Sequence, residues 1–228
     1  IVVTDGVQIL PFVTTMDHKA LLEGDKGPNT GGMGAISPSP FFDKELFSEV
    51  MKDIVFSTIS RMLEEGRKYR GVLYVGLMLT KEGPKVLEYN CRFGDPETQP
   101  QMLRLESDIV DIFLAALEGS LVEDFIRWSR KASGCVVLTS GGYPEKYEKG
   151  KVISGLEEFS ESSDIAVFHA GTKFENGTYL TNGGRVLNVC ASENTLAETM
   201  GKIYKAANKI SFEDMYYRKD IGVKKKEE

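Results

Sequence analysis

An apolar stretch of the chain turns abruptly polar where chemistry could take place. Residues 86–97 read VLEYNCRFGDPE and begin like a buried strand. Charged groups near a core are costly to desolvate unless they meet another charge, a metal or a ligand. So much polarity at the end of a strand therefore indicates a binding or catalytic site. Its candidate residues are Glu88, Asn90, Arg92, Asp95 and Glu97.

Glu88 and Asn90 have the spacing and chemistry of a cation site. Side chains two residues apart project from the same face of a strand, so a carboxylate and an amide oxygen would lie together. Such hard donors suit Mg²⁺ or Mn²⁺, and magnesium keeps waters and shares its shell with substrate phosphates. The alternative is that both side chains lie on a solvated strand face.

The residues that follow have structural as well as functional interpretations. Arg92 carries a planar, charged fork that suits a phosphate or another oxyanion. Asp95, Pro96 and Glu97 resemble a helix start, with Asp95 as the N-cap and Pro96 in the first turn. The functional interpretation adds a carboxylate for an amine substrate. Both interpretations can hold, because a cap residue can face a pocket.

A glycine-rich segment, GPNTGGMGA at residues 27–35, forms a second candidate site. Gly31, Gly32 and Gly34 would expose backbone N–H groups and let the main chain approach an anion closely. The spacing matches neither a P-loop nor a GxGxxG motif. Clustered glycines are also common in flexible turns, so the segment alone decides nothing.

Three versatile side chains, Asp17, His18 and Lys19, lie just upstream of the glycines. The whole segment 15–40 is rich in Gly, Pro, Asn and Asp and is expected to be a long loop, a kind of loop that is often functional. His18 is interpreted as a surface residue of that loop.

Periodicity predicts the elements that position these groups. Helical spacing of apolar residues predicts a helix over residues 43–65, ended by Gly66, and a second helix, DIVDIFLAALE, capped by Ser107 and closed by Gly119. Alternating apolar runs predict one hairpin around Asp5-Gly6 and another around residues 81–84. After residue 132, strands are predicted at CVVLT, DIAVFHAGT and GGRVLNVCAS, with a hairpin at Asn176-Gly177. A last helix, about residues 193–209, would be capped by Ser192.

Composition limits the classes of function. The chain has 228 residues, 41% of them hydrophobic, and a net charge of −6, so neither nucleic acid nor an anionic membrane is an expected partner. Its three scattered cysteines lack CxxC spacing, which argues for a reduced, cytoplasmic chain without a disulfide framework or structural zinc. The chain opens inside a β-rich segment without an initiator Met, and we expect it to be a piece of a longer polypeptide.

Taken together, the motifs resemble one family. DHKALLEGDKGPNTGGMGA, followed by GVLYVGLMLTKEGPKVLEYNCRFGDPET, resembles the glycinamide ribonucleotide synthetases (phosphoribosylamine–glycine ligases), ATP-grasp enzymes of purine biosynthesis. The resemblance continues through SGCVVLTSGGYPEKYEKG, FHAGT, TNGGRVLNV and YYRKDIG. It implies an α/β (α+β) fold class, with the larger ATP-grasp subdomain, an antiparallel sheet with helices, before a small strand-rich domain. The expected organisation is a subdomain at 1–120, a linker helix at 121–132, a C-terminal domain at 133–223 and a tail at 224–228.

The resemblance also implies a reaction. Glycine is joined to 5-phosphoribosylamine through glycyl phosphate while ATP, with Mg²⁺ or Mn²⁺, becomes ADP and phosphate. Glu88 and Asn90 would be the metal ligands and Arg92 would stabilise phosphoryl oxygens. Asp95 and Glu97 would position an amine. The loop with Gly31, Gly32 and Gly34 would hold the ribose phosphate or close over the site, lined by Asp17 and Lys19.

The same resemblance implies a partner and leaves alternatives open. Family members carry an N-terminal half that clamps the nucleotide, so this chain would need that half of the same enzyme for turnover. Alone, it could be a non-catalytic fragment that binds metal or phosphate. Another ATP-grasp carboxylate–amine ligase, or a hydrolase with paired acids, is a further alternative, although the hydrolase gives no role to Arg92 or to the glycine-rich loop.

Overall fold

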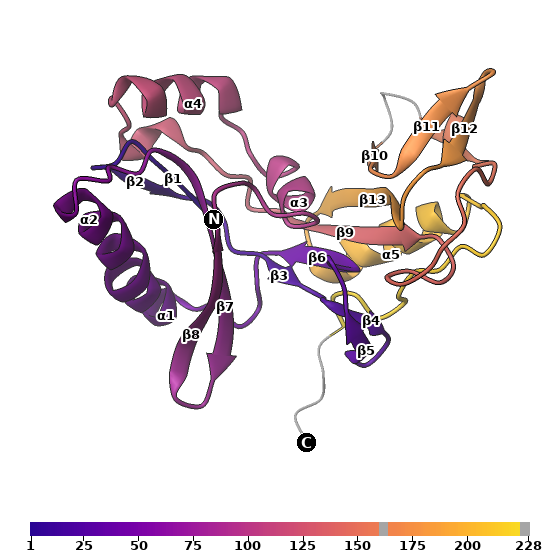
Figure 1. The fold of residues 1–228 in the computed structure, drawn as a ribbon, viewed down its shortest axis with the longest axis horizontal. Helices are drawn as coiled ribbons and strands as arrows, with labels where there is room; N and C mark the ends of the chain where they lie inside the picture. The colour runs from indigo at the N-terminus through magenta and orange to yellow at the C-terminus, as the bar shows by residue number, and fades with distance from the viewer. Residues whose placement is uncertain (160–163, 224–228) are drawn as a thin grey trace. The chain divides into compact units, whose positions relative to one another are not determined.

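The computed structural model describes residues 1–159 and 164–223, which divide into two compact units (Figure 1). The segments 15–37 and 95–104 belong to the same unit as the C-terminal part of the chain. Each unit is therefore made of several separate segments, whereas each expected domain is one continuous stretch of the sequence. The expected tail at 224–228 lies outside the described residues. Unit 1 comprises Ile1–Thr14, Pro38–Gly94 and Leu105–Ser129, and unit 2 comprises Thr15–Ser37, Asp95–Arg104 and the chain from Arg130 onward.

Unit 1 contains a four-stranded antiparallel sheet in the order β2-β1-β7-β8. Both predicted hairpins are confirmed, since β1 pairs with β2 and β7 with β8. Ten-residue β7 and its partner β8 form the long ribbon that carries the candidate metal pair (Figure 1). The strands are β1 (Val2–Thr4), β2 (Ile9–Pro11), β7 (Gly71–Thr80) and β8 (Gly83–Asn90).

One long helical segment packs on the sheet of unit 1, as the periodicity predicts. It begins at Asp43, whose side chain accepts a hydrogen bond from the N–H of Leu46, and ends before Gly66, which adopts a φ of 73°. Its middle is π-helical. The pieces are α1 (Lys44–Glu49), the π-helix Val50–Phe56 and α2 (Ser57–Glu64), and their core contacts include Val2, Val50, Val55, Ile59 and Leu73.

Helix α4 (Ile109–Glu118) packs on β1 and β7. It is closed by Gly119 as predicted, at a φ of 78°, but its N-cap is Asp108 and not Ser107. The Asp108 side chain accepts a hydrogen bond from Val110, which fixes the start one residue later. The linker helix expected at 121–132 is reduced to a three-residue 3-10 helix, Glu123–Phe125.

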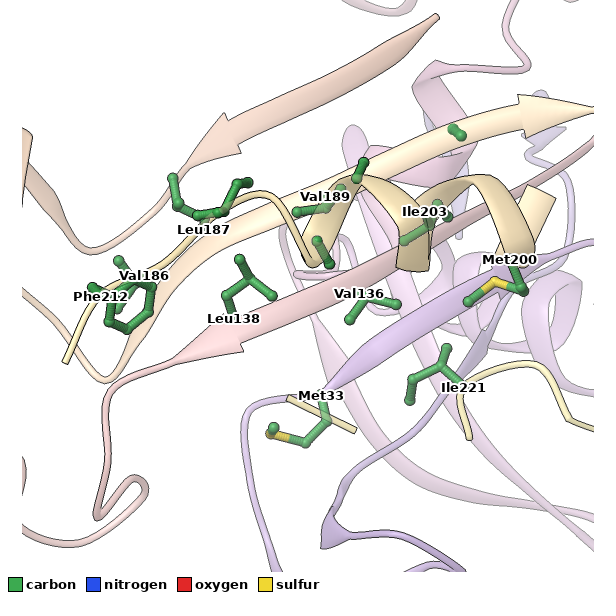
Figure 2. Packing of buried hydrophobic residues seen from close by; sticks show 14 of the residues in the cluster. Met33, Val136, Leu138, Val186, Leu187, Val189, Met200, Ile203, Phe212 and Ile221 are labelled. Atoms are coloured by element: carbon green, nitrogen blue, oxygen red, sulfur yellow. The ribbon is translucent and has the colours of Figure 1, made fainter. Parts of the chain in front are cut away.

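Unit 2 is built on a five-stranded antiparallel sheet in the order β10-β13-β9-β6-β3. All eight residues of β9 are buried, because helices cover both faces of this central strand. Val136 and Leu138 pack with α5 (Figure 2). Cys135 and Val137 face the other side of the sheet, where α3 ends. The elements are β3 (Met16–Asp17), β6 (Gly34–Ser37), α3 (Thr98–Met102), β9 (Ala132–Thr139), β10 (Ile165–His169), β13 (Arg185–Glu193) and α5 (Leu196–Ala207).

The prediction of a long loop at residues 15–40 is wrong, because this segment contains four short strands. Two of them, β3 and β6, complete the five-stranded sheet, and β4 (Ala20–Leu22) pairs with β5 (Lys26–Asn29). The glycines of this segment favour turns and so masked its strands, of which β6 has its partner, β9, about a hundred residues later in the sequence. The segment therefore contributes two strands to the five-stranded sheet and forms a separate two-stranded hairpin between them.

The remaining elements of unit 2 follow the predicted pattern with one shift. Hairpin β11 (Thr172–Glu175) and β12 (Thr178–Thr181) turns at Asn176-Gly177 as predicted, with positive φ at both residues. Helix α5 starts later than predicted, because Thr195 and Glu198 form a capping box in place of a Ser192 cap. A second 3-10 helix spans Leu156–Glu158. Among the described residues, no helix has the length and apolar character needed to cross a bilayer.

Candidate functional site

Glu88 and Asn90 project from one face of β8 in unit 1. Glu88 lies opposite Gly76 and Asn90 opposite Tyr74, two residues apart on the neighbouring strand. Cross-strand partners share a face, so the four residues form one continuous patch. The Glu88 side chain is exposed, and in the described part of the chain neither Glu88 nor Asn90 has a side-chain hydrogen bond or ion pair.

This pair fits a divalent cation that takes further ligands from elsewhere. The described residues contain no group of three His, Cys, Asp or Glu side chains that could hold a metal by themselves. One carboxylate and one amide oxygen are nevertheless the donors that Mg²⁺ uses together with waters and substrate phosphates. Two open, hard oxygen donors on an exposed strand face are therefore compatible with a metal bound through a nucleotide.

Arg92 is exposed two residues beyond the pair, also in unit 1. Its Nη1 donates a hydrogen bond to the carbonyl of Phe93 at 2.8 Å. No carboxylate pairs with its guanidinium within the described ranges. The remaining N–H groups can therefore bind an anionic ligand without first breaking an ion pair.

A second group of predicted residues meets in unit 2, at the edge of the five-stranded sheet. Asp17 on β3 lies opposite Ala35, which in turn lies opposite Cys135, so Asp17 faces the same side of the sheet as α3. Lys19 donates to Asp17 Oδ2 at 2.6 Å. Glu97, which directly precedes α3, is only 3% exposed, and its charge acts on Asp17.

The electrostatics of Asp17 are unusual for a carboxylate that has an ion-pair partner. Burial, followed by the negative charge of Glu97, raises the pKa of Asp17 to about 6. The Lys19 ammonium opposes this shift but is 41% exposed and therefore partly screened by water. Asp17 Oδ1 is buried and has no hydrogen-bond partner among the described residues. The cluster therefore attracts a cation or an N–H donor.

The glycines of the second motif make room for this cluster. A Cβ at Gly32 would lie 2.4 Å from Cδ of Pro96 and 2.8 Å from Oδ1 of Asp17. A Cβ at Gly34 would lie 2.5 Å from the carbonyl oxygen of Cys135. Only glycine permits both approaches.

Two of the three N–H groups expected to form an anion nest already have partners within the chain. The N–H of Gly31 donates to Tyr143 Oη at 3.0 Å, and that of Gly32 donates to Thr30 Oγ1 at 3.0 Å. Their geometry supports a role in lining the acidic cluster more directly than a role in cradling a phosphate.

Asp95 is tied to Arg185, a residue that the sequence reasoning missed. Arg185 Nη2 lies 3.1 Å from Asp95 Oδ2, and its Nη1 donates to the carbonyls of Asp95 and Gly31 at 2.7 and 2.8 Å. The other Asp95 oxygen accepts from Gln99 Nε2 at 3.1 Å. Asp95 is therefore not the predicted N-cap, because α3 begins at Thr98 with Glu97 in the cap position and no side-chain cap bond.

The signal that could have identified Arg185 is an arginine that opens an apolar strand directly after two glycines. In TNGGRVLNV this charge stands at the first residue of β13, whose next six residues are buried. Arg185 opens its apolar strand, whereas Arg92 follows one. The partners of Arg185, however, lie 90 and 154 residues away in sequence and could not be named.

A buried arginine anchors the hairpin that follows the acidic cluster. Arg218 is 1% exposed and binds Asp220 through two hydrogen bonds of 2.8 Å, Asp25 at 2.9 Å and the carbonyl of Ala20 at 3.0 Å. His18 is also buried, at 4% exposure, and its Nε2 accepts from the N–H of Gly222 at 3.4 Å. The surface position expected for His18 is therefore wrong. Burial and the positive charge of Arg218 lower the pKa of His18.

Comparison with known proteins places this architecture in a family. Residues 1–98 match the model of the phosphoribosylglycinamide synthetase ATP-grasp (A) domain, and residues 133–224 match that of the phosphoribosylglycinamide synthetase C domain. A phosphoribosylamine–glycine ligase of Vibrio parahaemolyticus is 49% identical over 223 residues, which cover 97% of this chain and 52% of that protein. Its counterpart in Caldanaerobacter subterraneus is 48% identical over 218 residues, with coverages of 96% and 52%.

Solved structures agree on the fold. The crystal structure of a phosphoribosylamine–glycine ligase from Thermotoga maritima matches with a TM-score of 0.84 and 36% identity, over 97% of this chain and 54% of that one. Biotin carboxylase from Campylobacter jejuni, solved as a complex with β-γ-ATP, matches with a TM-score of 0.65 at 12% identity, over 96% and 46% of the two chains. The second match supports the expected mixed fold of antiparallel sheets and helices.

The chain spans about half the length of the curated relatives it matches. Both family models match in the expected order, and the resemblance of the sequence motifs is confirmed. The chain therefore belongs to the phosphoribosylglycinamide synthetase family and has its ATP-grasp fold.

Proposed function

We propose that this chain supplies the metal-holding and substrate-holding residues of an ATP-dependent ligase that joins glycine to 5-phosphoribosylamine. The products would be glycinamide ribonucleotide, ADP and phosphate. Relatives named phosphoribosylamine–glycine ligase support this activity. The observation that carries the proposal is the open carboxylate–amide pair of Glu88 and Asn90 on an exposed strand face.

Glu88 and Asn90 would hold Mg²⁺ or Mn²⁺ beside the phosphates of ATP. When bound, the cation would neutralise charge that develops on the phosphoryl oxygens. Arg92 would contribute from the same unit by donating to phosphoryl or acyl-phosphate oxygens. Its freedom from carboxylate partners supports this role.

The acidic cluster of unit 2 would position an amine. Burial and the charge of Glu97 raise the pKa of Asp17, and Asp17 Oδ1 is left without a hydrogen-bond partner among the described residues, which favours an ammonium or amine group. Asp95 is occupied by Arg185 and Gln99, so we assign it to holding the wall of the cluster. Gly31, Gly32 and Gly34 would form the rest of that wall.

The proposed reaction has two displacements. A carboxylate oxygen of glycine attacks the γ-phosphorus of ATP, the bond to the β-phosphate oxygen breaks, and glycyl phosphate and ADP form. The amine nitrogen of phosphoribosylamine then attacks the acyl carbon, and phosphate leaves with the bonding electron pair. The proton lost by the nitrogen passes to a phosphate oxygen or to an ionised carboxylate of the acidic cluster. Orientation of the amine is the contribution of the cluster.

The chain would work together with the N-terminal half of the same enzyme. Its relatives are about twice its length, and the resemblance assigns nucleotide clamping to that other half. We place the reaction in the cytoplasm, with small molecules as the only substrates. A net charge of −6 gives no general attraction to nucleic acid or to anionic membranes.

The test is Glu88→Ala in a complete enzyme, made by joining this chain to the half of the Vibrio parahaemolyticus relative that it does not match. Product formation from ATP, glycine and 5-phosphoribosylamine, followed by mass spectrometry, should fall at least roughly 100-fold. Glu82→Ala is the matched control, because Glu82 is an exposed carboxylate of the same hairpin, 3.6 Å from Lys85. Retention of turnover by Glu88→Ala at saturating Mg²⁺ would exclude the metal assignment.

A further inference from the structure

The two strands of the β7–β8 ribbon are not in uniform register. Leu77 lies opposite Val86, but the next residue back along β7, Gly76, lies opposite Glu88. Between these two pairs β8 has one extra residue, Leu87, which forms a β-bulge. Bulges of this kind re-aim the side chains that follow them.

The bulge decides which face Glu88 occupies. With uniform register, Glu88 would lie opposite Val75, which packs against the apolar cluster of the long helical segment. A shift of one residue moves a strand's side chains to the other face. The extra residue therefore turns Glu88 away from the apolar side and onto the open face that carries Asn90.

Gly76 provides the space into which the Glu88 side chain is turned. A Cβ at this position would lie 3.1 Å from Cγ of Glu88 and 3.3 Å from Cε1 of Tyr74. The φ of Gly76 is outside the left-handed region, so its backbone would accept any residue and only space requires glycine. Glycine weakens a strand interior, and its use there marks a close approach.

We propose that Gly76 is a positioning residue which, with the bulge at Leu87, holds the Glu88 carboxylate where a cation shared with Asn90 can bind. The inference rests on the proposed metal role of Glu88. A methyl group at position 76 would push Cγ of Glu88 by a few tenths of an ångström and so displace its carboxylate. Gly76 acts only through Glu88, so its effect on metal affinity disappears when Glu88 is no longer a ligand.

The experiment titrates Mn²⁺ onto this chain and records paramagnetic broadening of backbone amide resonances by NMR. The expected result for the parent chain is saturable broadening centred on residues 74–76 and 88–90. Gly76→Ala should raise the dissociation constant for Mn²⁺ roughly tenfold, as outer-shell changes at metal sites do. Glu88→Gln should remove the saturable broadening.

A double-mutant cycle separates the positioning role of Gly76 from the metal-binding role of Glu88. In the Glu88→Gln background, addition of Gly76→Ala should leave the residual Mn²⁺ response unchanged. If Glu88→Gln weakens Mn²⁺ binding but Gly76→Ala does not, the positioning role is wrong and the metal assignment stands. If the parent shows no saturable broadening, or Glu88→Gln leaves it intact, the proposed metal role fails and the inference fails with it.

Stability provides the control for misfolding. Alanine is preferred to glycine in a strand interior, so Gly76→Ala should keep or raise the unfolding temperature while it weakens the metal site. Gly201→Ala is the matched methyl addition, because a Cβ at Gly201 in α5 meets no atom within 4 Å. This variant should bind Mn²⁺ like the parent. A drop in unfolding temperature for Gly76→Ala, without a change in Mn²⁺ affinity, would show a structural role alone.

Discussion

Asp17 carries the strongest electrostatic signal of the acidic cluster. Burial and the charge of Glu97 hold its pKa at about 6, above the ordinary value of 3.8. The folded state therefore binds the Asp17 proton more tightly than the unfolded state does. The stability that this proton contributes is fully present below the ordinary pKa and is lost as the pH rises through 6.

Replacement of Asp17 by asparagine should remove this pH dependence. At pH 7 the variant should exceed the parent in free energy of unfolding by up to about 3 kcal/mol, because a shift of about two pKa units is involved. At pH 4 the two proteins should be close to equal. Urea denaturation at both pH values measures the difference. An equal difference at pH 4 and pH 7 would contradict the raised pKa.

The identity of the metal pair could be predicted from the sequence, whereas the composition of the acidic cluster could not. Glu88 and Asn90 are two residues apart, and the period of a strand is local information. Asp17 and Glu97 are eighty residues apart and come together only because β3 joins the sheet edge on the side of α3. Sequence alone grouped Glu97 with Asp95, whose carboxylate is instead tied to Arg185.

Arg218 is predicted to anchor the hairpin β4–β5. This buried guanidinium compensates Asp25 and Asp220 and also binds the carbonyl of Ala20, so it fastens the hairpin to the C-terminal segment of unit 2. Arg218→Met would remove the guanidinium that pairs with both carboxylates. The free energy of unfolding should fall by roughly 3 kcal/mol, the lower end for a broken buried pair because both aspartates are partly exposed.

Lys209→Met provides the comparison for this change. Lys209 and Glu158 form a pair at 2.6 Å in which both side chains are about half exposed. Loss of such a surface pair costs at most about 1 kcal/mol. Urea denaturation of both variants, with amide exchange of residues 18–31, measures the effect. A loss below 1 kcal/mol for Arg218→Met, with unchanged exchange in the hairpin, would refute the anchoring role.

Elements with strong local patterns were predicted well, and those defined by distant pairing were not. The helix at residues 43–65 and the hairpins at Asp5-Gly6 and Asn176-Gly177 carry their own periodicity and turn residues. Strand β6 is short and rich in small residues, and its burial comes from pairing with β9, whereas the two-residue β3 is defined only by its pairing with β6. The bulge at Leu87 likewise depends on pairing with β7, which the sequence of β8 does not contain.

The free thiols test the packing of the core of unit 2. Cys135 and Cys190 are fully buried and lie opposite each other on β9 and β13, whereas Cys91 is exposed. Burial raises the pKa of Cys135 well above its usual range, which lowers its reactivity further. An aromatic disulfide reagent should therefore titrate one thiol rapidly in the native chain and three in denaturant. Rapid reaction of two or three thiols under native conditions would contradict this packing.

This chain matches only about half of each of these relatives, so its activity without the other half can be predicted and tested. Glu88, Asn90, Arg92 and the acidic cluster lie within residues 1–223, but the resemblance assigns nucleotide clamping to the half that this chain does not match. The chain alone should therefore bind Mn²⁺ weakly and form no glycinamide ribonucleotide. Joined to the missing half of the Vibrio parahaemolyticus relative, it should turn over with ATP, glycine and 5-phosphoribosylamine. Full activity of the chain alone would show that it contains a complete nucleotide site, and the proposed need for a second half would then be abandoned.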